Sequence, residues 1–372
     1  MHIAINSRSF LLPRYTGIGR YAFNLVRNLL DIDRDNQYTL YARKGLFDRK
    51  RRLPAIHAPN LTVREDHFGF GPAGVIPRFD VFHSPAPEMC PVKKHKLVVT
   101  IHDLVYKMFP EGHTPDACRQ TDRQIRSLIP RARKFICCSE STRGDLMRFF
   151  EIPWEKTVVI HQGVDHDVFY SIGENEKQNA LQRLKEMGIK TDYVLFVGTI
   201  EPRKNLERVL EAFAGLVKRG VFSGQLVIAG MMGWKTDGVH QAVVDLGINS
   251  HVLFLGYVRD FELRYLYNCC EAFVFPSMYE GFGYPILEAL CCGAPVVTSD
   301  VSSCPEVAGD AAITVNPASS EEIAAAVEDI LINEDLRADM VKKGFLRAEG
   351  FSFRKNAEQT LSVYREVGGG AR

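Results

Sequence analysis

Short apolar runs alternate with longer amphipathic segments along the first half of the chain. The runs predict buried strands, because a strand covered on both faces reads as a nearly continuous apolar stretch. They are Ile3–Asn6, Tyr38–Ala42, Asp80–His83, Leu97–Ile101, Phe135–Ser139 and Val158–His161. Between them, apolar residues at helical spacing predict helices, one carrying Phe23, Val26 and Leu30 and another spanning Arg119–Lys134. This alternation is typical of an α/β domain built on one sheet.

The same alternation returns in the second half of the chain. Strands are predicted at Tyr193–Val197, Gln225–Ala229, Val252–Leu255, Phe273–Pro276 and Val296–Ser299. Helices are predicted at Ala180–Met187, Glu321–Asn333, Leu336–Glu349 and Phe353–Val367, and a polar linker at Ser171–Lys177. A chain of 372 residues is too long for one ordinary core. We therefore expect two domains, at residues 1–168 and 169–352.

The segment Phe273–Asp300, FVFPSMYEGFGYPILEALCCGAPVVTSD, combines a strand, a loop, a helix and a second strand. Pro285 suits the first turn of the helix. The helix N-terminus then offers N–H groups at Gly283 and Tyr284, which form a ready site for an anion. Glu288 follows within an otherwise apolar helix. If Glu288 is buried it needs a partner, and a vicinal diol such as a ribose would satisfy both oxygens; the alternative is an exposed acid favoured by the helix dipole.

Glu280 and Glu288 stand eight positions apart around a Gly-Phe-Gly turn and ahead of Gly-Ala-Pro-Val-Val. This arrangement resembles the EX7E motif of retaining family 4 glycosyltransferases. The resemblance implies the GT-B architecture, in which two Rossmann-like domains face each other across a deep cleft and a final helix, here 353–372, crosses back to the first domain. It also implies that Glu280 lies at the donor sugar and Glu288 at the ribose. The diphosphate is expected on the loop between them, formed by Gly281, Phe282, Gly283 and Tyr284.

A second group of polar residues follows the strand Tyr193–Val197. The sequence Gly198-Thr-Ile-Glu-Pro-Arg-Lys-Asn places Arg203 and Lys204 just before a helix. Two cations there oppose the helix dipole unless an anion is present, so they indicate a bound diphosphate. Family members more often have Gly-Arg-x-x-x-x-Lys, so Lys204 keeps its place whereas Thr199 replaces the arginine. The resemblance implies that Lys204 and Arg203 stabilise the departing diphosphate, with Gly198 beside them.

A polar pair, His102-Asp103, follows the strand Leu97–Ile101. Such a pair at the carboxyl end of a strand lies in the crevice where α/β sheets bind ligands. Family members carry a similar pair, which implies that His102 contacts the sugar hydroxyls and that Asp103 lies at the donor. A hydrogen-bonded loop histidine is the alternative. The resemblance also places the nucleotide base beside the strand Val252–Leu255, at Gly256, Tyr257 and Val258.

The stretch Gly17-x-Gly-x-x-Ala superficially matches the glycine fingerprint of dinucleotide-binding folds. The match is weak, because the glycines come about ten residues after the first strand and because Arg43-Lys44, not an acid, follows the next one. A NAD-dependent dehydrogenase is therefore disfavoured. The family resemblance implies instead that the Gly17 backbone reaches toward the donor.

Composition narrows the class of protein. An apolar content of 46% with 24% charged residues describes a soluble globular protein. No segment approaches the ~20 apolar residues of a membrane span, and the start of the chain lacks a signal-peptide pattern. Nine cysteines without a CxxC motif favour reduced core thiols, so we expect a cytoplasmic location. No DxD-type pair of acids stands at a strand end, so we expect no metal.

Charge is distributed unevenly. Residues 1–168 contain 26 Lys and Arg and 18 Asp and Glu, which gives a net charge of +8. Residues 169–372 contain 20 Lys and Arg and 27 Asp and Glu, which gives −7. The two values sum to the net charge of +1 of the whole chain. Six basic residues fall within Arg43–Arg52. The basic half suits peripheral contact with anionic lipid at the inner face of a membrane, or a polyanionic acceptor, and is equally typical of ordinary solvated surface. No nucleic acid partner is expected.

The variant Glu-Pro-Arg-Lys-Asn at residues 201–205 most resembles bacterial mannosyltransferases of surface polysaccharide synthesis. It implies a retaining, metal-independent hexosyltransferase that moves mannose from GDP-mannose to a glycan or lipid-linked acceptor. The nucleotide diphosphosugar is then a co-substrate, and no cofactor is expected. UDP-glucose or UDP-N-acetylglucosamine as donor is one alternative, and a nucleotide-sugar epimerase of the same fold is another. A two-domain solute-binding protein is disfavoured by the missing signal peptide.

Overall fold

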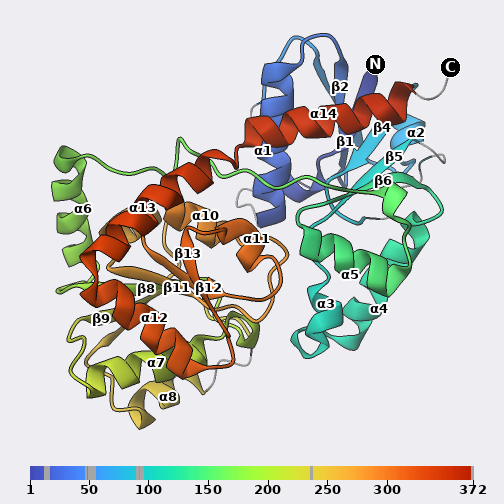
Figure 1. The fold of residues 1–372 in the computed structure, drawn as a ribbon. Coiled ribbons are helices and arrows are strands. Elements are labelled where there is room, and N and C mark those ends of the chain that lie inside the picture. Colours follow the sequence, from blue (N-terminus) through green and yellow to red (C-terminus); the bar gives the residue numbers. More distant parts are fainter. Residues whose placement is uncertain are drawn as a thin grey trace. The chain divides into compact units, whose positions relative to one another are not determined.

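The computed structural model describes residues 1–11, 17–46, 48, 56–88, 92, 96–234 and 238–369. The chain forms two compact units (Figure 1). The first comprises Met1–Gly163 together with Ser352–Arg372, and the second comprises Val164–Phe351. The boundary between the units therefore follows Gly163 rather than residue 168, and the final segment belongs to the first unit. Within the described residues, no helix is long and apolar enough to cross a membrane.

A seven-stranded sheet forms the centre of the first unit. Its strands are β1 (His2–Asn6), β2 (Gln37–Arg43), β3 (Leu61–Asp66), β4 (Val81–Ser84), β5 (Leu97–Ile101), β6 (Ala132–Cys137) and β7 (Thr157–Val159). Their order is β3-β2-β1-β4-β5-β6-β7, and every neighbouring pair is parallel. The order reverses between β1 and β4, as in a Rossmann-like sheet.

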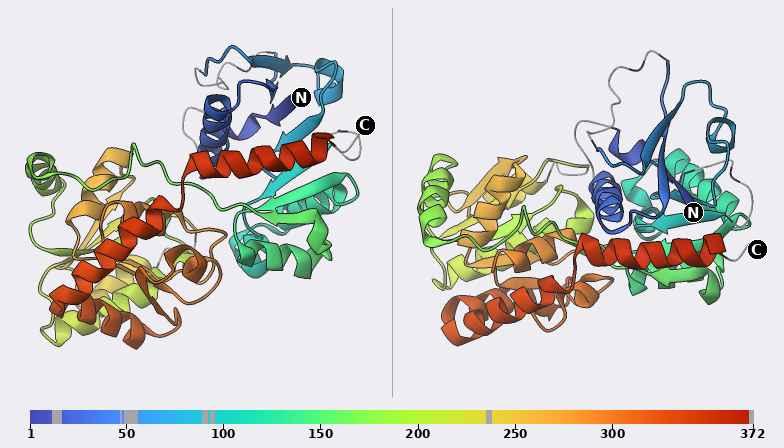
Figure 2. Two further views of the ribbon diagram at one scale, coloured as in Figure 1. Left: turned by 45° about the horizontal axis from the view of Figure 1, so that its top comes forward. Right: turned by 90° about the horizontal axis from the view of Figure 1, so that it is seen from above.

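Helices cover the first sheet, because parallel strands need crossover connections. They are α1 (Gly17–Ile32), α2 (Pro72–Val75), α3 (Val105–Met108), α4 (Pro115–Leu128), α5 (Glu140–Phe150) and, from the end of the chain, α14 (Phe353–Gly369). Helix α14 packs against α1 (Figure 2). The Tyr364 hydroxyl of α14 lies 2.6 Å from His83 Nδ1 on β4, and Asn356 Nδ2 donates to the His161 carbonyl oxygen at 2.7 Å. These two bonds, the first of them buried, attach the final helix to the first unit.

A six-stranded parallel sheet forms the centre of the second unit. Its strands are β8 (Tyr193–Val197), β9 (Gln225–Ala229), β10 (Val252–Gly256), β11 (Ala272–Phe275), β12 (Val296–Ser299) and β13 (Ala312–Val315). They follow the order β10-β9-β8-β11-β12-β13, which reverses between β8 and β11. The helices are α6 (Glu174–Glu186), α7 (Leu206–Lys218), α8 (Val239–Asp245), α9 (Asp260–Cys269), α10 (Tyr284–Cys291), α11 (Cys304–Ala308), α12 (Ser320–Ile332) and α13 (Glu334–Glu349).

Strands β8, β11 and β12 are buried along their whole length. Central strands with helices on both faces are expected to read this way. Phe196 of β8 and Val274 of β11 share one core with Leu210 of α7 and Ile330 of α12. Burial of each such side chain stabilises the unit by roughly 1.5–3 kcal/mol. The central strands therefore give a rigid base to the loops at their carboxyl ends.

One predicted helix and one predicted linker differ from the structure. The helix predicted over Arg119–Lys134 ends at Leu128, because Pro130 cannot continue a helix, and β6 begins already at Ala132. The linker predicted at Ser171–Lys177 is wrong, since α6 begins at Glu174. Acidic side chains in its first turn favour that start through the helix dipole.

Candidate active site

The carboxyl ends of β8 and β11 lie side by side, because these strands are neighbours in the second sheet. The strand order reverses at this pair, and open α/β sheets bind ligands where it does so. The loop after β8 holds Arg203 and Lys204, and the loop after β11 holds Glu280. The fold therefore brings together three residues that the sequence predicts for the donor site.

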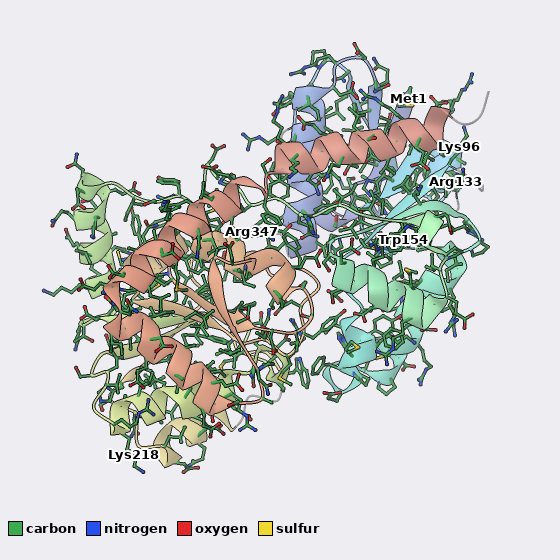
Figure 3. The ribbon with its side chains drawn as sticks, in the orientation of Figure 1. Met1, Lys96, Arg133, Trp154, Lys218 and Arg347 are labelled. Atoms are coloured by element: carbon green, nitrogen blue, oxygen red, sulfur yellow. The ribbon has the colours of Figure 1, made fainter. Side chains whose placement is uncertain are left out.

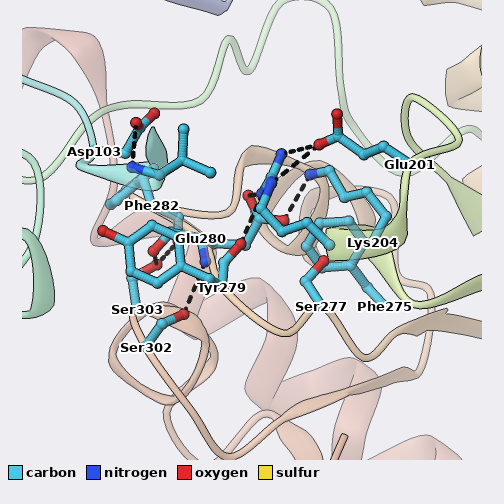
Figure 4. Close-up of polar contacts among 12 residues, drawn as sticks. Asp103, Glu201, Lys204, Phe275, Ser277, Tyr279, Glu280, Phe282, Ser302 and Ser303 are labelled. Atoms are coloured by element: carbon cyan, nitrogen blue, oxygen red, sulfur yellow. Dashed lines mark hydrogen bonds and ion pairs between the residues drawn. The ribbon is translucent and has the colours of Figure 1, made fainter. Parts of the chain in front are cut away.

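Lys204 and Arg203 form ion pairs with the two oxygens of Glu280. Lys204 Nζ lies 2.6 Å from Oε1, and Arg203 Nη1 lies 3.0 Å from Oε2. Figure 4 shows the Lys204 side chain pointing toward Glu280. Lys204 Nζ also lies 4.8 Å from the centre of the Phe275 ring. Arg203 Nη1 donates in addition to the Tyr279 carbonyl oxygen at 2.7 Å, which holds the guanidinium on the loop that carries Glu280.

A second carboxylate, Glu201, completes this cluster and was not predicted from the sequence. Its Oε1 accepts hydrogen bonds from Arg203 Nε at 3.0 Å and Nη2 at 2.5 Å. Its Oε2 accepts one from Trp234 Nε1 at 3.2 Å. In the sequence, Glu201 is recognisable only as an acid two residues before Arg203. The 3-10 turn Pro202–Lys204 brings the two side chains within hydrogen-bonding distance.

Burial and charge act in opposite directions on this cluster. Burial lowers the pKa of Lys204, and the neighbouring Glu280 opposes the shift. Burial raises the pKa of Glu280, but the charges of Lys204 and Arg203 outweigh it, so this pKa lies below its ordinary value. With Glu201, two carboxylates face two cations, and the cluster has no net formal charge. A diphosphate placed here would therefore compete with Glu280, the carboxylate that pairs with both cations.

Asn205 connects the two loops. Its backbone lies in the left-handed region, with φ of +64°, a conformation that asparagine tolerates better than most residues. Its Nδ2 donates to the carbonyl oxygens of Pro276 at 2.9 Å and Pro317 at 2.7 Å. Because these bonds are buried, they fix the loop after β8 against the loop after β11. They thereby set the distance between Lys204 and Glu280.

Two serines from the segment after β12 hold the loop that carries Glu280. Ser302 Oγ accepts a hydrogen bond from the Glu280 N–H at 2.9 Å. Ser303 Oγ lies 3.0 Å from the Glu280 carbonyl oxygen and 2.8 Å from that of Phe282. Gly283 has φ of +108°, where an L side chain is strained, and α10 begins directly after it. The structure thus has the predicted turn and helix start. Gly281 lies within the same turn, between Glu280 and Phe282.

Glu288 is buried in α10, which excludes the alternative of an exposed first-turn acid. Its Oε2 accepts a hydrogen bond at 3.2 Å from the hydroxyl of Tyr267 on α9. A protein group thus contacts this carboxylate, where the sequence predicted a ribose diol for both of its oxygens. Phe282 is likewise buried, with its ring against Tyr284 and Phe351 at centroid distances of 5.6 and 6.0 Å. Because the Phe282 side chain is buried, we expect this residue to contact a ligand through its backbone.

The glycines at two strand ends approach other groups closely. A Cβ added at Gly198 would lie 3.6 Å from the stem of Lys204, so Gly198 lies beside this cation; its contact with a donor stays a prediction. Gly256 has φ of +67°, and its carbonyl oxygen accepts a hydrogen bond from the Gly230 N–H at 2.8 Å. Tyr257 follows with an exposed side chain and Val258 with a half-buried one. The contact of these residues with a base stays a prediction.

His102, in the first unit, uses both ring nitrogens within the protein. Nε2 lies 2.7 Å from the Pro85 carbonyl oxygen, and Nδ1 lies 2.7 Å from Gln162 Nε2. Because the carbonyl only accepts, Nε2 carries the proton and Nδ1 accepts from the amide. Burial lowers the pKa of His102, which favours this neutral form. The edge of the imidazole contacts the Tyr21 ring, with centroids 4.9 Å apart.

The remaining predicted site residues of the first unit have simpler surroundings. Asp103 is exposed, and its Oδ1 accepts a hydrogen bond at 3.0 Å from the Val105 N–H at the start of α3. Gly17 is exposed and is the first residue of α1. Most of the basic stretch after Lys44, at residues 47 and 49–52, lies outside the described residues. Among the described residues, no three His, Cys, Asp or Glu side chains gather as metal ligands; metal independence stays a prediction.

Two family models match the chain. Residues 15–168 match the model described as Glycosyltransferase Family 4, and residues 182–347 match Glycosyl transferases group 1. The first match lies in the first unit apart from its last residues, and the second lies within the second unit. It includes Arg203, Lys204, Glu280 and Glu288.

Individual proteins agree with these models. The chain is 32% identical over 286 residues to O-antigen chain mannosyltransferase B of Escherichia coli, which covers 77% of this chain and 74% of that protein. Sucrose-phosphate synthase from Thermosynechococcus elongatus superposes with a TM-score of 0.74 at 20% identity over 98% of both chains. Anabaena Alr3699/HepE in complex with UDP and glucose superposes with a TM-score of 0.73 at 17% identity, over 98% of this chain and 100% of that one. The chain therefore belongs to glycosyltransferase family 4 and has the GT-B fold.

Proposed function

We propose that this glycosyltransferase moves mannose from GDP-mannose to a glycan or lipid-linked acceptor of surface polysaccharide synthesis, with retention of the α-configuration. The observation that carries the proposal is the pair of cations, Arg203 and Lys204, held by Glu280 where the strand order reverses. The Escherichia coli relative is named an O-antigen chain mannosyltransferase, which supports the sugar and the pathway. The Glu-Pro-Arg-Lys-Asn sequence supports the same choice.

In this proposal, Lys204 and Arg203 hold the diphosphate of the donor. Their charges stabilise the negative charge that develops on the leaving group, together with the N-terminus of α10 at Gly283 and Tyr284. The incoming diphosphate replaces Glu280 as their partner. The Glu280 carboxylate is then released to accept hydrogen bonds from the hydroxyls of the donor sugar.

Glu288 binds the ribose of the donor. Tyr267 donates to Oε2 of Glu288 and orients the carboxylate toward the donor. Tyr267 is therefore a positioning residue. Base recognition falls to the backbone around Gly256, Tyr257 and Val258.

Retention follows from attack on the same face that the diphosphate leaves. The transition state is oxocarbenium-like, and the departing diphosphate is the base closest to the incoming acceptor hydroxyl. In the first unit, His102 is neutral and hydrogen-bonded at both ring nitrogens. A neutral ring with both nitrogens engaged suits contact with the sugar better than proton transfer.

A second candidate donor is UDP-glucose. It is favoured by the solved complex of Alr3699/HepE with UDP and glucose, which has the same fold. In both cases no metal is required, because cations and a helix terminus already address the phosphates. Contact of the basic first unit with anionic lipid is part of the proposal, since a lipid-linked acceptor lies at a membrane.

The test is a transfer assay with GDP-mannose, UDP-glucose and UDP-N-acetylglucosamine on a short-glycan and a lipid-linked acceptor. The expected product is an α-mannoside from GDP-mannose, identified at its anomeric centre by NMR, at a rate unchanged by EDTA. A β-linked product would overturn the mechanism. An α-glucoside from UDP-glucose alone would leave the mechanism standing and remove the mannose assignment. Activity that EDTA abolishes and Mg²⁺ restores would contradict metal independence.

A further inference from the structure

Two phenylalanines project from the turn after β3 in the first unit. Phe68 is 72% exposed and Phe70 is 67% exposed, and their ring centroids lie 5.7 Å apart. We call these two side chains the aromatic tip. Phe68 is the most exposed of the large apolar side chains that the structure describes. Because the two exposed rings are neighbours, they form one apolar patch, and such a patch with a polar rim is typical of an interaction site.

The turn is held rigidly by the buried carboxylate of Asp66. Its oxygens accept hydrogen bonds from the N–H groups of Gly69 at 2.7 Å, Phe70 at 3.0 Å and Gly71 at 2.8 Å, and from the Tyr41 hydroxyl at 2.7 Å. Burial raises the pKa of Asp66, but these bonds outweigh it, so the carboxyl is charged at neutral pH. The backbone of the turn is therefore fixed, and it presents both rings to the solvent.

Cations stand beside the aromatic tip. The Arg43 guanidinium lies over the turn, 3.2 Å from the position of a Cβ added at Gly69. Lys44 follows it at the carboxyl end of β2, and its N–H donates to the Asp66 carbonyl oxygen at 3.2 Å. The only carboxylate paired with Lys44 in the described residues is Glu65, at 3.5 Å. Leu46, two positions after Lys44, is also exposed.

Apolar rings flanked by cations are typical of a segment that enters the interface of an anionic bilayer. We propose that Phe68 and Phe70 insert among the acyl chains at the surface of an anionic membrane, while Arg43 and Lys44 contact lipid phosphates. The proposal rests on the proposed function, because a lipid-linked acceptor brings the enzyme to that surface. It identifies the aromatic tip as the part of the first unit that contacts the membrane.

The geometry of the rings disfavours a sugar as their partner. The two ring planes are inclined by 46°, so they offer no common flat platform for a pyranose. The carboxylates nearby are engaged, since Glu65 pairs with Lys44 and His67, and Asp66 accepts bonds from its own turn. Trp154, another exposed aromatic residue of this unit (Figure 3), differs because the Arg143 guanidinium lies 3.4 Å from the centre of its ring and covers it.

The first experiment measures co-sedimentation with vesicles of phosphatidylglycerol and phosphatidylcholine, without donor or acceptor. The variant Phe68→Ser/Phe70→Ser is expected to bind phosphatidylglycerol vesicles at least about tenfold more weakly than the unaltered protein. The matched control is Ile332→Ser/Leu346→Ser in the second unit, where the side chains are 69% and 63% exposed. The control is expected to bind as the unaltered protein does, and both variants should keep its melting temperature.

The second experiment places a probe in the tip. Phe68→Trp should show a blue-shifted emission on anionic vesicles and quenching by brominated acyl chains. Arg43→Gln/Lys44→Gln should weaken binding to phosphatidylglycerol vesicles and reduce its dependence on salt. Unchanged vesicle binding of the double serine variant, with or without a raised KM for a soluble glycan acceptor, would overturn the proposal. Because the binding assays use no nucleotide sugar, their failure is distinct from a failure of the proposed transfer.

Discussion

Lys204 and Glu280 lie 76 positions apart in the chain, yet their Nζ and Oε1 atoms are 2.6 Å apart. They leave neighbouring strands at the point where the strand order reverses, and Asn205 ties their two loops together. Both side chains are buried. A buried ion pair is weak evidence for a contribution to stability, and in our proposal the pair serves to bind the donor.

Replacement of Lys204 is expected to weaken binding of the donor diphosphate. Lys204→Ala should cost about 1.5–3 kcal/mol in affinity for a nucleoside diphosphate, the range of charge-assisted hydrogen bonds. Titration calorimetry measures this loss. Lys218→Ala, at the exposed end of α7, is the control and should bind normally. An unchanged affinity of Lys204→Ala would remove Lys204 from the site.

Neutralisation of Glu280 should separate binding from turnover. Glu280→Gln keeps the shape of the side chain but no longer competes with a diphosphate for Lys204 and Arg203. Affinity for the free nucleoside diphosphate is therefore expected to rise, whereas kcat of transfer should fall because the donor sugar loses its carboxylate. Calorimetry and steady-state kinetics on the same preparation check both. A loss of diphosphate affinity in this variant would contradict the exchange of partners.

Glu201 is expected to act by holding Arg203. Glu201→Gln keeps one acceptor for the guanidinium but loses the charge, so we expect a lower affinity for the diphosphate and a smaller loss than in Lys204→Ala. Trp234→Phe removes only the hydrogen bond to Glu201 Oε2 and should have a still smaller effect in the same direction. If either variant bound the diphosphate more tightly, Glu201 would be a competitor of the ligand instead of a support for Arg203.

Glu288 is expected to distinguish ribose from deoxyribose. The unaltered enzyme should bind a nucleoside diphosphate more tightly than its 2′,3′-dideoxy analogue, and Glu288→Gln should reduce that preference. Tyr267→Phe, which removes one hydrogen bond to the carboxylate, should reduce it less. For each variant, four affinities are measured: those of the unaltered enzyme and of the variant for the nucleoside diphosphate and for its dideoxy analogue. A full preference retained in Glu288→Gln would show that the ribose is held elsewhere.

The first unit should lose stability as the pH falls below neutrality. His83 is buried between the Tyr364 hydroxyl and the Thr100 hydroxyl, and burial lowers its pKa from 6.5 to about 3. Between about pH 6.5 and pH 3, His83 is protonated in the unfolded chain but neutral in the folded chain. The free energy of unfolding therefore falls by up to ~1.4 kcal/mol for each pH unit in that window.

Denaturant unfolding at pH 5.0, 5.5, 6.0 and 6.5 tests the role of His83. His83→Gln should be less stable than the unaltered protein at every pH because its hydrogen bonds change, but its stability should depend less steeply on pH. His102, whose pKa burial also lowers, keeps its own contribution in this variant. Equal slopes for the two proteins would show that His83 is not the group that titrates.

The local pattern of apolar and turn residues was sufficient to predict the core strands and the turn that carries Glu280. Tyr193–Val197, Gln225–Ala229 and Val296–Ser299 were predicted with their observed bounds, because a buried parallel strand reads as an apolar run between turn residues. The turn before α10 was predictable for a similar reason, since Gly283 and Pro285 specify backbone conformations that few other residues favour. The strands β3 and β13 were not predicted. The exposed edge strand β3 has a polar sequence that carries no such run.

Tertiary structure alone decided which polar groups meet. The partners of Glu288 and His102 lie 21 and 60 positions away, at Tyr267 and Gln162, and no spacing rule connects side chains at those separations. The sequence of this protein determined its two α/β units and, apart from Glu201, the acids and cations of its proposed donor site, because those follow from short-range patterns. The pairing of Lys204 with Glu280, and hence the electrostatics of the site, came from the order of strands in a folded sheet.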